Sequence, residues 1–294
     1  MSRADCDAII IGGGPAGLAA GMHLARAGYE ARLFESGRLG GQARLLGKIE
    51  NYPGFPWGIG GRELMERWVR QALRWGLRAR RARVCGVSRW NGGFKVRTSK
   101  GRVFKTRSVL CCMGGKFKSL SVPGEERLLG RGVYHGAFEE MPKFCGKVVA
   151  VAGGGEAAVH QAIGLSRHAR SVYLIHRGDR LKAHRFLRER LSLRPNVFCV
   201  FGTEIRTLEG ERKLRRVWVR DLKAGTCRPL AADALFVLIG KEAASLPRLG
   251  RRRPAGLFLA GDADGSAFRQ VAVAGGEGIK AAMECIRYLE GLDA

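Results

Sequence analysis

The sequence lacks any uncharged apolar run long enough to cross a membrane, which takes about 18 residues or more. Its N-terminus passes into a strand-like apolar run without the charged and apolar regions of a secretion signal. We therefore expect a cytoplasmic protein with no membrane span.

Acidic residues are scarce, because 26 Asp and Glu stand against 52 Lys and Arg, for a formal net charge of +26 and a pI near 10.7. Such a charge attracts acidic partners, which include small acidic electron-carrier proteins, nucleic acid and anionic lipid. No known nucleic-acid-binding module accompanies the basic residues, so the sequence does not favour nucleic acid. The simplest structure for the densest cluster is a solvated helix end and turn; its members are Arg74, Arg78, Arg80, Arg81 and Arg83.

Cysteine spacing excludes two common sites. None of the eight cysteines forms a C-x-x-C pair or a zinc-binding spacing, so we expect no metal and mostly reduced, buried thiols. The vicinal pair Cys111-Cys112 lies within the strand-like run 109–113, which favours burial over a redox role.

The first binding motif of the sequence is a glycine-rich turn that follows the apolar run 8–11. Gly12, Gly14 and Gly17 meet the G-x-G-x-x-G spacing, and Pro15 and Ala16 open a predicted helix over 15–27. Glu35 ends the next predicted strand, 31–34, where an acid can bind ribose hydroxyls. The pattern predicts a dinucleotide site with the pyrophosphate at the helix N-terminus.

The same pattern returns after the predicted strand 148–152. Gly153, Gly155 and Ala158 keep G-x-G-x-x-A, ahead of a predicted helix over 156–167 and a strand over 171–175. Glu35 and His176 each stand 23 residues after the first glycine of their motif. The second copy ends in a basic segment that includes Arg177 and Lys182, which suits a 2′-phosphate and so predicts NADP.

The remaining segments predict an α/β fold. A helix is expected over 61–75, three alternating runs at 83–90, 94–98 and 103–112 predict an antiparallel meander, and a second hairpin is expected over 204–222. A strand over 256–262 and a helix over 271–289 close the chain. We expect two Rossmann-like dinucleotide-binding domains, the second inserted in the first, with boundaries at 1–115 plus 241–294 and at 116–240.

These motifs resemble the low-molecular-weight thioredoxin reductase family over nearly the whole chain. The matching segments are 12–17, 40–42, 50–54, 123–125, 153–155, 176–177, 260–262 and 269–270. The resemblance implies a homodimer with FAD in the first domain and NADPH, with NADH possible, in the second. It places Asp262 and Gln270 at the ribityl chain and flavin and Gln42 and Asn51 along the isoalloxazine; Gly41, Gly261 and Arg269 belong to the same cofactor-binding set.

The departures from the family pattern bear on mechanism. Gly136 and Glu139 stand where the family has its two redox cysteines, and only a thiolate can exchange with a disulfide. Disulfide reduction by the family mechanism is therefore excluded on this reading. Gly178 replaces a family arginine and Lys182 another, so NADP is held by fewer donors, and the segment 239–256 is about twenty residues shorter than the pattern.

We expect an FAD-dependent NAD(P)H oxidoreductase that passes electrons to an acidic one-electron carrier such as ferredoxin or flavodoxin. The resemblance supports this reading, because the ferredoxin (flavodoxin) reductase branch also lacks the cysteine pair. Two alternatives stay open: an NAD(P)H oxidase or a reductase of quinones or other small-molecule acceptors, and a non-catalytic flavin or nucleotide sensor.

Overall fold

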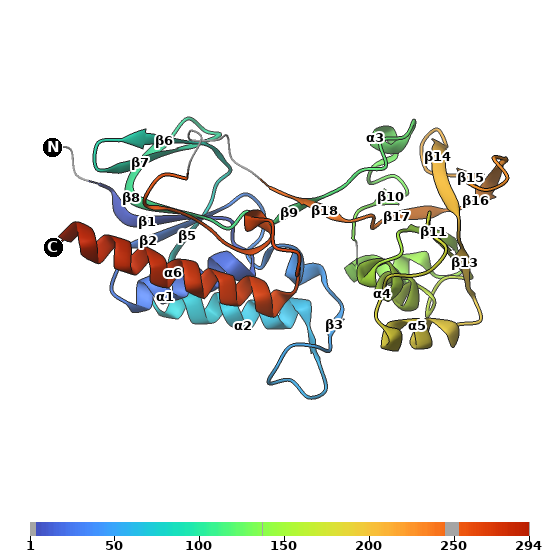
Figure 1. The fold of residues 1–294 in the computed structure, drawn as a ribbon, viewed down its shortest axis with the longest axis horizontal. Helices are drawn as coiled ribbons and strands as arrows, with labels where there is room; N and C mark the ends of the chain where they lie inside the picture. The colour runs from blue at the N-terminus through green and yellow to red at the C-terminus, as the bar shows by residue number, and fades with distance from the viewer. Residues whose placement is uncertain (1–3, 137, 245–252, 294) are drawn as a thin grey trace. The chain divides into compact units, whose positions relative to one another are not determined.

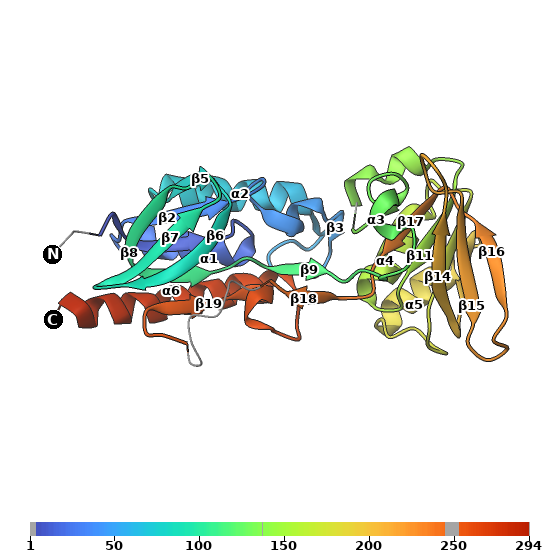
Figure 2. The same cartoon turned by 90° about the horizontal axis from the view of Figure 1, so that it is seen from above.

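A computed structural model describes residues 4–136, 138–244 and 253–293 of the chain. The chain divides into two compact units, Met1–Lys116 with Glu242–Ala294 (unit 1) and Phe117–Lys241 (unit 2). It passes between the units twice, in β9 (Gly115–Phe117) and β18 (Lys241–Ala243), which pair as a two-stranded ribbon. Figures 1 and 2 show the elements of each unit.

Unit 1 is built on a seven-stranded mixed sheet in the order β5-β2-β1-β8-β7-β6, with β19 paired to β8. The strands are β1 (Cys6–Ile11), β2 (Ala31–Glu35), β5 (Arg78–Arg81), β6 (Val84–Trp90), β7 (Gly93–Thr98), β8 (Val103–Cys111) and β19 (Leu257–Leu259). The pairs β1–β2 and β1–β8 are parallel, whereas β6–β7 and β7–β8 are antiparallel. The predicted meander is thereby confirmed.

Three helices lie together on one face of this sheet: α1 (Pro15–Arg26), α2 (Gly61–Arg74) and α6 (Val271–Asp293) (Figure 1). Ile10 of β1, Leu18 of α1 and Ala282 of α6 are buried in one core. Small residues let α1 and α6 approach closely, since a Cβ at Gly278 would lie 2.1 Å from the carbonyl oxygen of Ala16. The short elements of the unit are η1 (Gly41–Leu45), β3 (Lys48–Ile49), β4 (Ile59–Gly60) and η3 (Gly261–Asp264).

Unit 2 has a five-stranded parallel sheet in the order β10-β17-β11-β12-β13. Alternate residues of β11 face different layers: Val149 and Val151 pack with α4, and Ala150 and Ala152 pack with an antiparallel sheet β14-β15-β16. The strands are β10 (Val133–Tyr134), β11 (Val148–Ala152), β12 (Ser171–Ile175), β13 (Val197–Val200), β14 (Thr203–Glu209), β15 (Arg216–Asp221), β16 (Cys227–Ala231) and β17 (Ala234–Val237). The helices are α3 (Glu125–Leu128), η2 (Phe138–Phe144), α4 (Glu156–Leu165) and α5 (Arg185–Ser192).

The predicted α/β class is confirmed, and both glycine motifs lie between a strand and a helix as expected. The interpretation of the arginine cluster as a helix end and turn is confirmed for Arg74, the last residue of α2. It was wrong for Arg78–Arg81, which is a strand at the edge of the sheet, paired with β2. The predicted strand 256–262 is shorter, since the backbone turns into η3 at Gly261. The prediction of a shortened segment at 239–256 concerns residues 245–252, which lie outside the described residues.

None of the helices in the described part of the chain combines the length and apolar character that a membrane span requires.

Candidate functional site

The first glycine turn is shaped by two close backbone approaches. Gly12 has φ +104°, and a Cβ there would lie 2.3 Å from the carbonyl oxygen of Cys112. A Cβ on Gly17 would lie 1.9 Å from the carbonyl oxygen of Gly12. Glycine at both positions therefore allows β1, the turn and α1 to pack together.

The middle glycine of this turn faces open space. No atom lies within 4 Å of where a Cβ on Gly14 would stand. Gly14 is the N-cap of α1, where no side chain caps the helix, Pro15 occupies the first turn and no acid is present. The free N–H groups and the helix dipole at this open position suit a phosphate group.

Glu35 is held beside the same turn. Its Oε2 accepts a hydrogen bond of 2.7 Å from the backbone N–H of Gly13, and its Oε1 accepts one of 2.6 Å from the N–H of Gly37. The carboxylate is thus fixed at the end of β2, while its binding of ribose stays a prediction.

Two distant segments reach the N-terminus of α1. A Cβ on Gly41 would lie 3.0 Å from the Cα of Gly14, and a Cβ on Gly261 would lie 3.0 Å from the Cβ of Ala16. The structure therefore brings Gly41 and Gly261 to the first glycine turn.

The predicted flavin-side residues form two further contacts. The Gln42 Nε2 donates to the carbonyl oxygen of Gly115 at 2.6 Å, and a Cβ on Gly115 would lie 3.5 Å from the Asp262 carboxylate. The Asn51 Nδ2 donates to the Gln270 Oε1 at 2.9 Å. Arg269 is exposed on the loop before α6. Together these features fit a dinucleotide such as FAD. They are the open space for a phosphate group at Gly14, which we call a glycine cradle, the fixed Glu35 carboxylate and these polar side chains.

The second glycine turn repeats this construction in unit 2. A Cβ on Gly153 would lie 2.4 Å from the carbonyl oxygen of Leu238 and 2.9 Å from the Cβ of Ala158. Gly155 faces open space at the uncapped N-terminus of α4. Glu156 follows in the first turn, with its Oε1 2.8 Å from His184 Nε2. This turn, too, leaves room for a phosphate group.

His176 covers the second turn. A Cβ on Gly154 would lie 2.5 Å from the imidazole ring, so the ring packs directly on the glycine backbone. Burial lowers the pKa of His176 first, and the positive charges of Lys182 and Arg177 lower it further. The buried Nε2 has no hydrogen-bond partner in the described structure.

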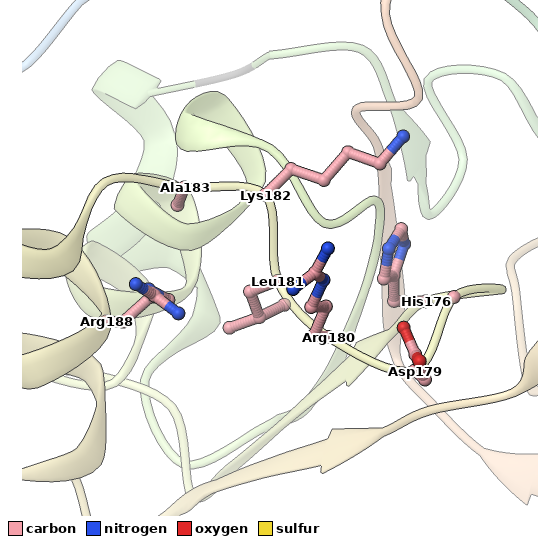
Figure 3. A pocket seen from close by; sticks show the side chains of 8 residues that line it. His176, Asp179, Arg180, Leu181, Lys182, Ala183 and Arg188 are labelled. Carbon is pink, nitrogen blue, oxygen red and sulfur yellow. The ribbon is translucent and has the colours of Figure 1, made fainter.

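A cavity of about 480 Å³ opens beside this histidine (Figure 3). Its lining consists of His176, Gly178, Asp179, Arg180, Leu181, Lys182, Ala183 and Arg188. The predicted residues His176 and Lys182 therefore meet at one cavity, whereas Arg177 is not part of its lining. Sequence reasoning missed Arg180 and Arg188, although the density of arginine after the second motif was a usable signal.

Position 136, which the sequence pattern aligns with the first redox cysteine of the resembled family, has little room for a side chain. Gly136 has φ +71°, and a Cβ there would lie 2.9 Å from the ring of Phe117. A side chain at this position would need a strained backbone and a displaced aromatic ring. Glu139 lies in η2, and its side chain is outside the described structure.

All eight cysteines are free thiols. Burial raises the pKa of Cys111 to about 12 and that of Cys112 further, so neither forms a thiolate near neutral pH. The exposed cysteines are Cys85, Cys145, Cys199 and Cys227. Among the described residues, no group of three or more His, Cys, Asp and Glu side chains could hold a metal ion.

Residues 6–278 match the model of the pyridine nucleotide-disulphide oxidoreductase family. The chain is 34% identical to a thioredoxin reductase of Treponema pallidum, covering 98% of each chain. It is 29% identical to a 34.2 kDa protein in the rubredoxin operon of Clostridium pasteurianum, covering 97% of each. The crystal structure of Lactococcus lactis thioredoxin reductase matches it with a TM-score of 0.92 and 29% identity, over 98% of this chain and 100% of that one.

Proposed function

The chain belongs to the pyridine nucleotide-disulphide oxidoreductase family, and on that premise we propose that it passes electrons from NADPH through FAD to an external acceptor without a disulfide of its own. The observation that carries the proposal is the pair of open glycine cradles, one in each unit, at Gly14 and Gly155. Two separate cradles suit two different dinucleotides.

Unit 1 is proposed to hold FAD. The N-terminus of α1 would take the pyrophosphate, Glu35 the ribose hydroxyls, and Gln42, Asn51, Asp262 and Gln270 the ribityl and ring portions. The predicted set also includes Gly41, Gly261 and Arg269. When bound, FAD supplies hydride acceptance from a nicotinamide and electron transfer onward.

Unit 2 is proposed to hold NADPH. The N-terminus of α4 would take its pyrophosphate, and the basic segment that begins at His176 would take its 2′-phosphate. The chain has His176 and Arg177 directly after β12, where the first copy ends in Glu35, and the cavity beside them is lined by three Lys and Arg side chains and one carboxylate, Asp179. NADPH is therefore the better-suited nicotinamide, with NADH as the alternative.

Electron transfer without a protein disulfide is supported by positions 136 and 139. Neither is a cysteine, and the Phe117 ring occupies the space that a side chain at 136 would need. Cys111 and Cys112 are buried with raised pKa values, so they are poorly suited to replace the missing pair. Several relatives are thioredoxin reductases, and we expect this chain to differ from them by having no redox-active disulfide.

The acceptor we propose is an acidic one-electron carrier of the ferredoxin or flavodoxin kind. The net charge of +26 supports this choice, since it favours encounter with an acidic protein. The relative from a rubredoxin operon supports it indirectly. We further propose that the chain works as a homodimer in the cytoplasm.

An acceptor assay tests the proposal. Purified protein should be yellow with one FAD per chain, and it should oxidise NADPH with ferredoxin or flavodoxin at a rate that falls steeply with salt, because the Debye length is about 10 Å at 0.1 M. Thioredoxin should not be reduced, and a neutral quinone should show little salt dependence. Turnover with oxygen or quinone alone would favour the oxidase alternative, and no turnover with bound FAD would favour the sensor.

A further inference from the structure

The backbone of the basic segment after β12 is held in place by its neighbours. The N–H of Lys182 donates to the carbonyl oxygen of Gly154 at 2.7 Å, which ties the segment to the second glycine turn. The N–H of Gly202 donates to the carbonyl oxygen of Gly178 at 3.0 Å, which ties it to the start of β14. The side chains between these anchors therefore project from a fixed loop.

Position 178 contributes no side-chain donor to this loop. Besides lacking a side chain, Gly178 lies so close to His176 that a Cβ there would stand 2.9 Å from the imidazole Nε2. An arginine at 178 would thus have to displace the ring that covers the second glycine turn. A donor for a phosphate group must come from elsewhere in the segment.

Arg180 supplies a cation at the right place. In the view of Figure 3 its guanidinium lies between Leu181 and the His176 ring, and the Lys182 ammonium and the Asp179 carboxylate lie above and below that ring. Arg188 lies beyond Leu181. Arg177, one residue from His176, is exposed and does not line the cavity.

In the part of the chain that the structure describes, the three cations of the cavity form no ion pair. Among the described residues, no acidic side chain lies within ion-pair distance of Arg180, Lys182 or Arg188, although many other arginines are paired, as Arg185 is with Glu189 at 2.6 Å. Asp179 also lines the cavity, so three cations stand against one carboxylate and the excess positive charge favours binding of an anion. A phosphate monoester, with two negative charges and several acceptor oxygens, matches this arrangement, and the planar fork of arginine suits it best.

We propose that Arg180 takes over the phosphate contact that Gly178 cannot make and is the residue by which this chain selects NADP(H) over NAD(H). This inference rests on the proposed function, because it assumes that unit 2 binds a nicotinamide dinucleotide. It assigns the main guanidinium contact to Arg180, with Lys182 beside it, and gives Arg177 no direct part.

The test is a binding measurement that needs no turnover. FAD-loaded wild-type protein and the variants Arg180→Ala, Arg180→Lys and Arg177→Ala are titrated calorimetrically with 2′,5′-ADP, with 5′-AMP and with inorganic phosphate. Arg177→Ala tests the rival assignment, because the sequence predicted Arg177 as a phosphate contact, whereas this exposed residue does not line the cavity.

Arg180→Ala should weaken 2′,5′-ADP binding by about tenfold or more, the usual effect of losing a charge-assisted contact, and leave 5′-AMP within about twofold. Arg180→Lys should recover part of the loss, and Arg177→Ala should change neither ligand by more than about threefold. The inference is overturned if Arg177→Ala causes the loss and Arg180→Ala does not, or if inorganic phosphate binds as tightly as 2′,5′-ADP.

The same titration separates this inference from the proposed function. Wild-type protein that binds 5′-AMP and 2′,5′-ADP equally has a nucleotide site without phosphate selection, which overturns the role of Arg180 and leaves the oxidoreductase proposal standing. Wild-type protein that binds neither nucleotide overturns both.

Discussion

Single residues in the first glycine turn serve two different ends. Gly17 is required by the fold, because its Cα lies against the carbonyl of Gly12, whereas Gly14 faces open space and is needed only if a ligand approaches there. The same contrast separates Gly153 from Gly155 in unit 2. Substitutions at the two kinds of glycine should therefore fail in different ways.

Gly14→Glu should leave the FAD-free protein as stable as the wild type and abolish FAD retention, because a carboxylate would fill the phosphate cradle. Gly17→Ala should lower the free energy of unfolding by about 1–3 kcal/mol or more, since α1 must move away from the turn. Thermal unfolding of the apoproteins and absorbance after reconstitution measure the two effects, with Gly14→Gln separating bulk from charge. Stoichiometric FAD in Gly14→Glu would contradict this assignment.

His176 predicts a pH dependence. The pKa of His176 is lower in the folded protein than in the unfolded chain, where it is about 6.5. The stability that neutral His176 contributes is therefore fully present above pH 6.5. As the pH falls below that value toward the lower folded pKa, the unfolded state binds the proton first and stability is lost. His176→Gln should lose less stability than the wild type between pH 7 and pH 5, as measured by urea unfolding. An NMR titration that gave His176 a pKa above 6.5 would refute this.

At the scale of elements, the sequence best predicted the helices and strands whose formation depends on neighbouring residues in the chain. Both strand-turn-helix units follow from glycine spacing and apolar runs, and β12 has the predicted bounds. The edge strand β5 could not be predicted, because its sequence Arg-Ala-Arg-Arg shows no apolar alternation and its extended state depends on pairing with β2.

Arg180 was not predicted as a site residue, because the family pattern directs attention to positions 177, 178 and 182. Only the folded loop shows which side chains line the cavity.

Most of the arginine cluster lies along or just after the edge strand β5. Arg80, Arg81 and Arg83 are exposed along and just after the edge strand, where charge also prevents edge-to-edge aggregation, while Arg78 pairs with Glu30 at 2.9 Å. If this edge helps to bind an acidic carrier, its charge should matter more than equal charge elsewhere.

Reversing Arg80, Arg81 and Arg83 to glutamate should lower kcat/KM for the acidic carrier about tenfold at low salt and leave the rate with a neutral quinone within about twofold. The control reverses Arg212, Lys223 and Arg228, which are exposed in unit 2 and give the same change in net charge. Stopped-flow or steady-state assays at several salt concentrations report the effect. Equal losses in the two variants would show that only the total charge matters.

At the scale of the whole molecule, the chain consists of two units with similar glycine turns and different polar ends. The first copy ends in Glu35, fixed by backbone N–H groups, and the second ends in a basic cavity beside His176. On our account each unit holds one dinucleotide, and FAD passes the electrons of NADPH directly to the acceptor without a protein disulfide, since no cysteine pair stands at 136 and 139.

The number of electrons that the oxidised protein accepts tests this account most directly. FAD takes two electrons, and a redox-active disulfide would take two more. Anaerobic titration of the FAD-loaded protein with dithionite, followed by flavin absorbance and by alkylation of newly formed thiols, should end at two electrons per FAD with no new thiols. An end point of four electrons with two additional alkylated cysteines would show that the chain carries a redox disulfide and would contradict the account.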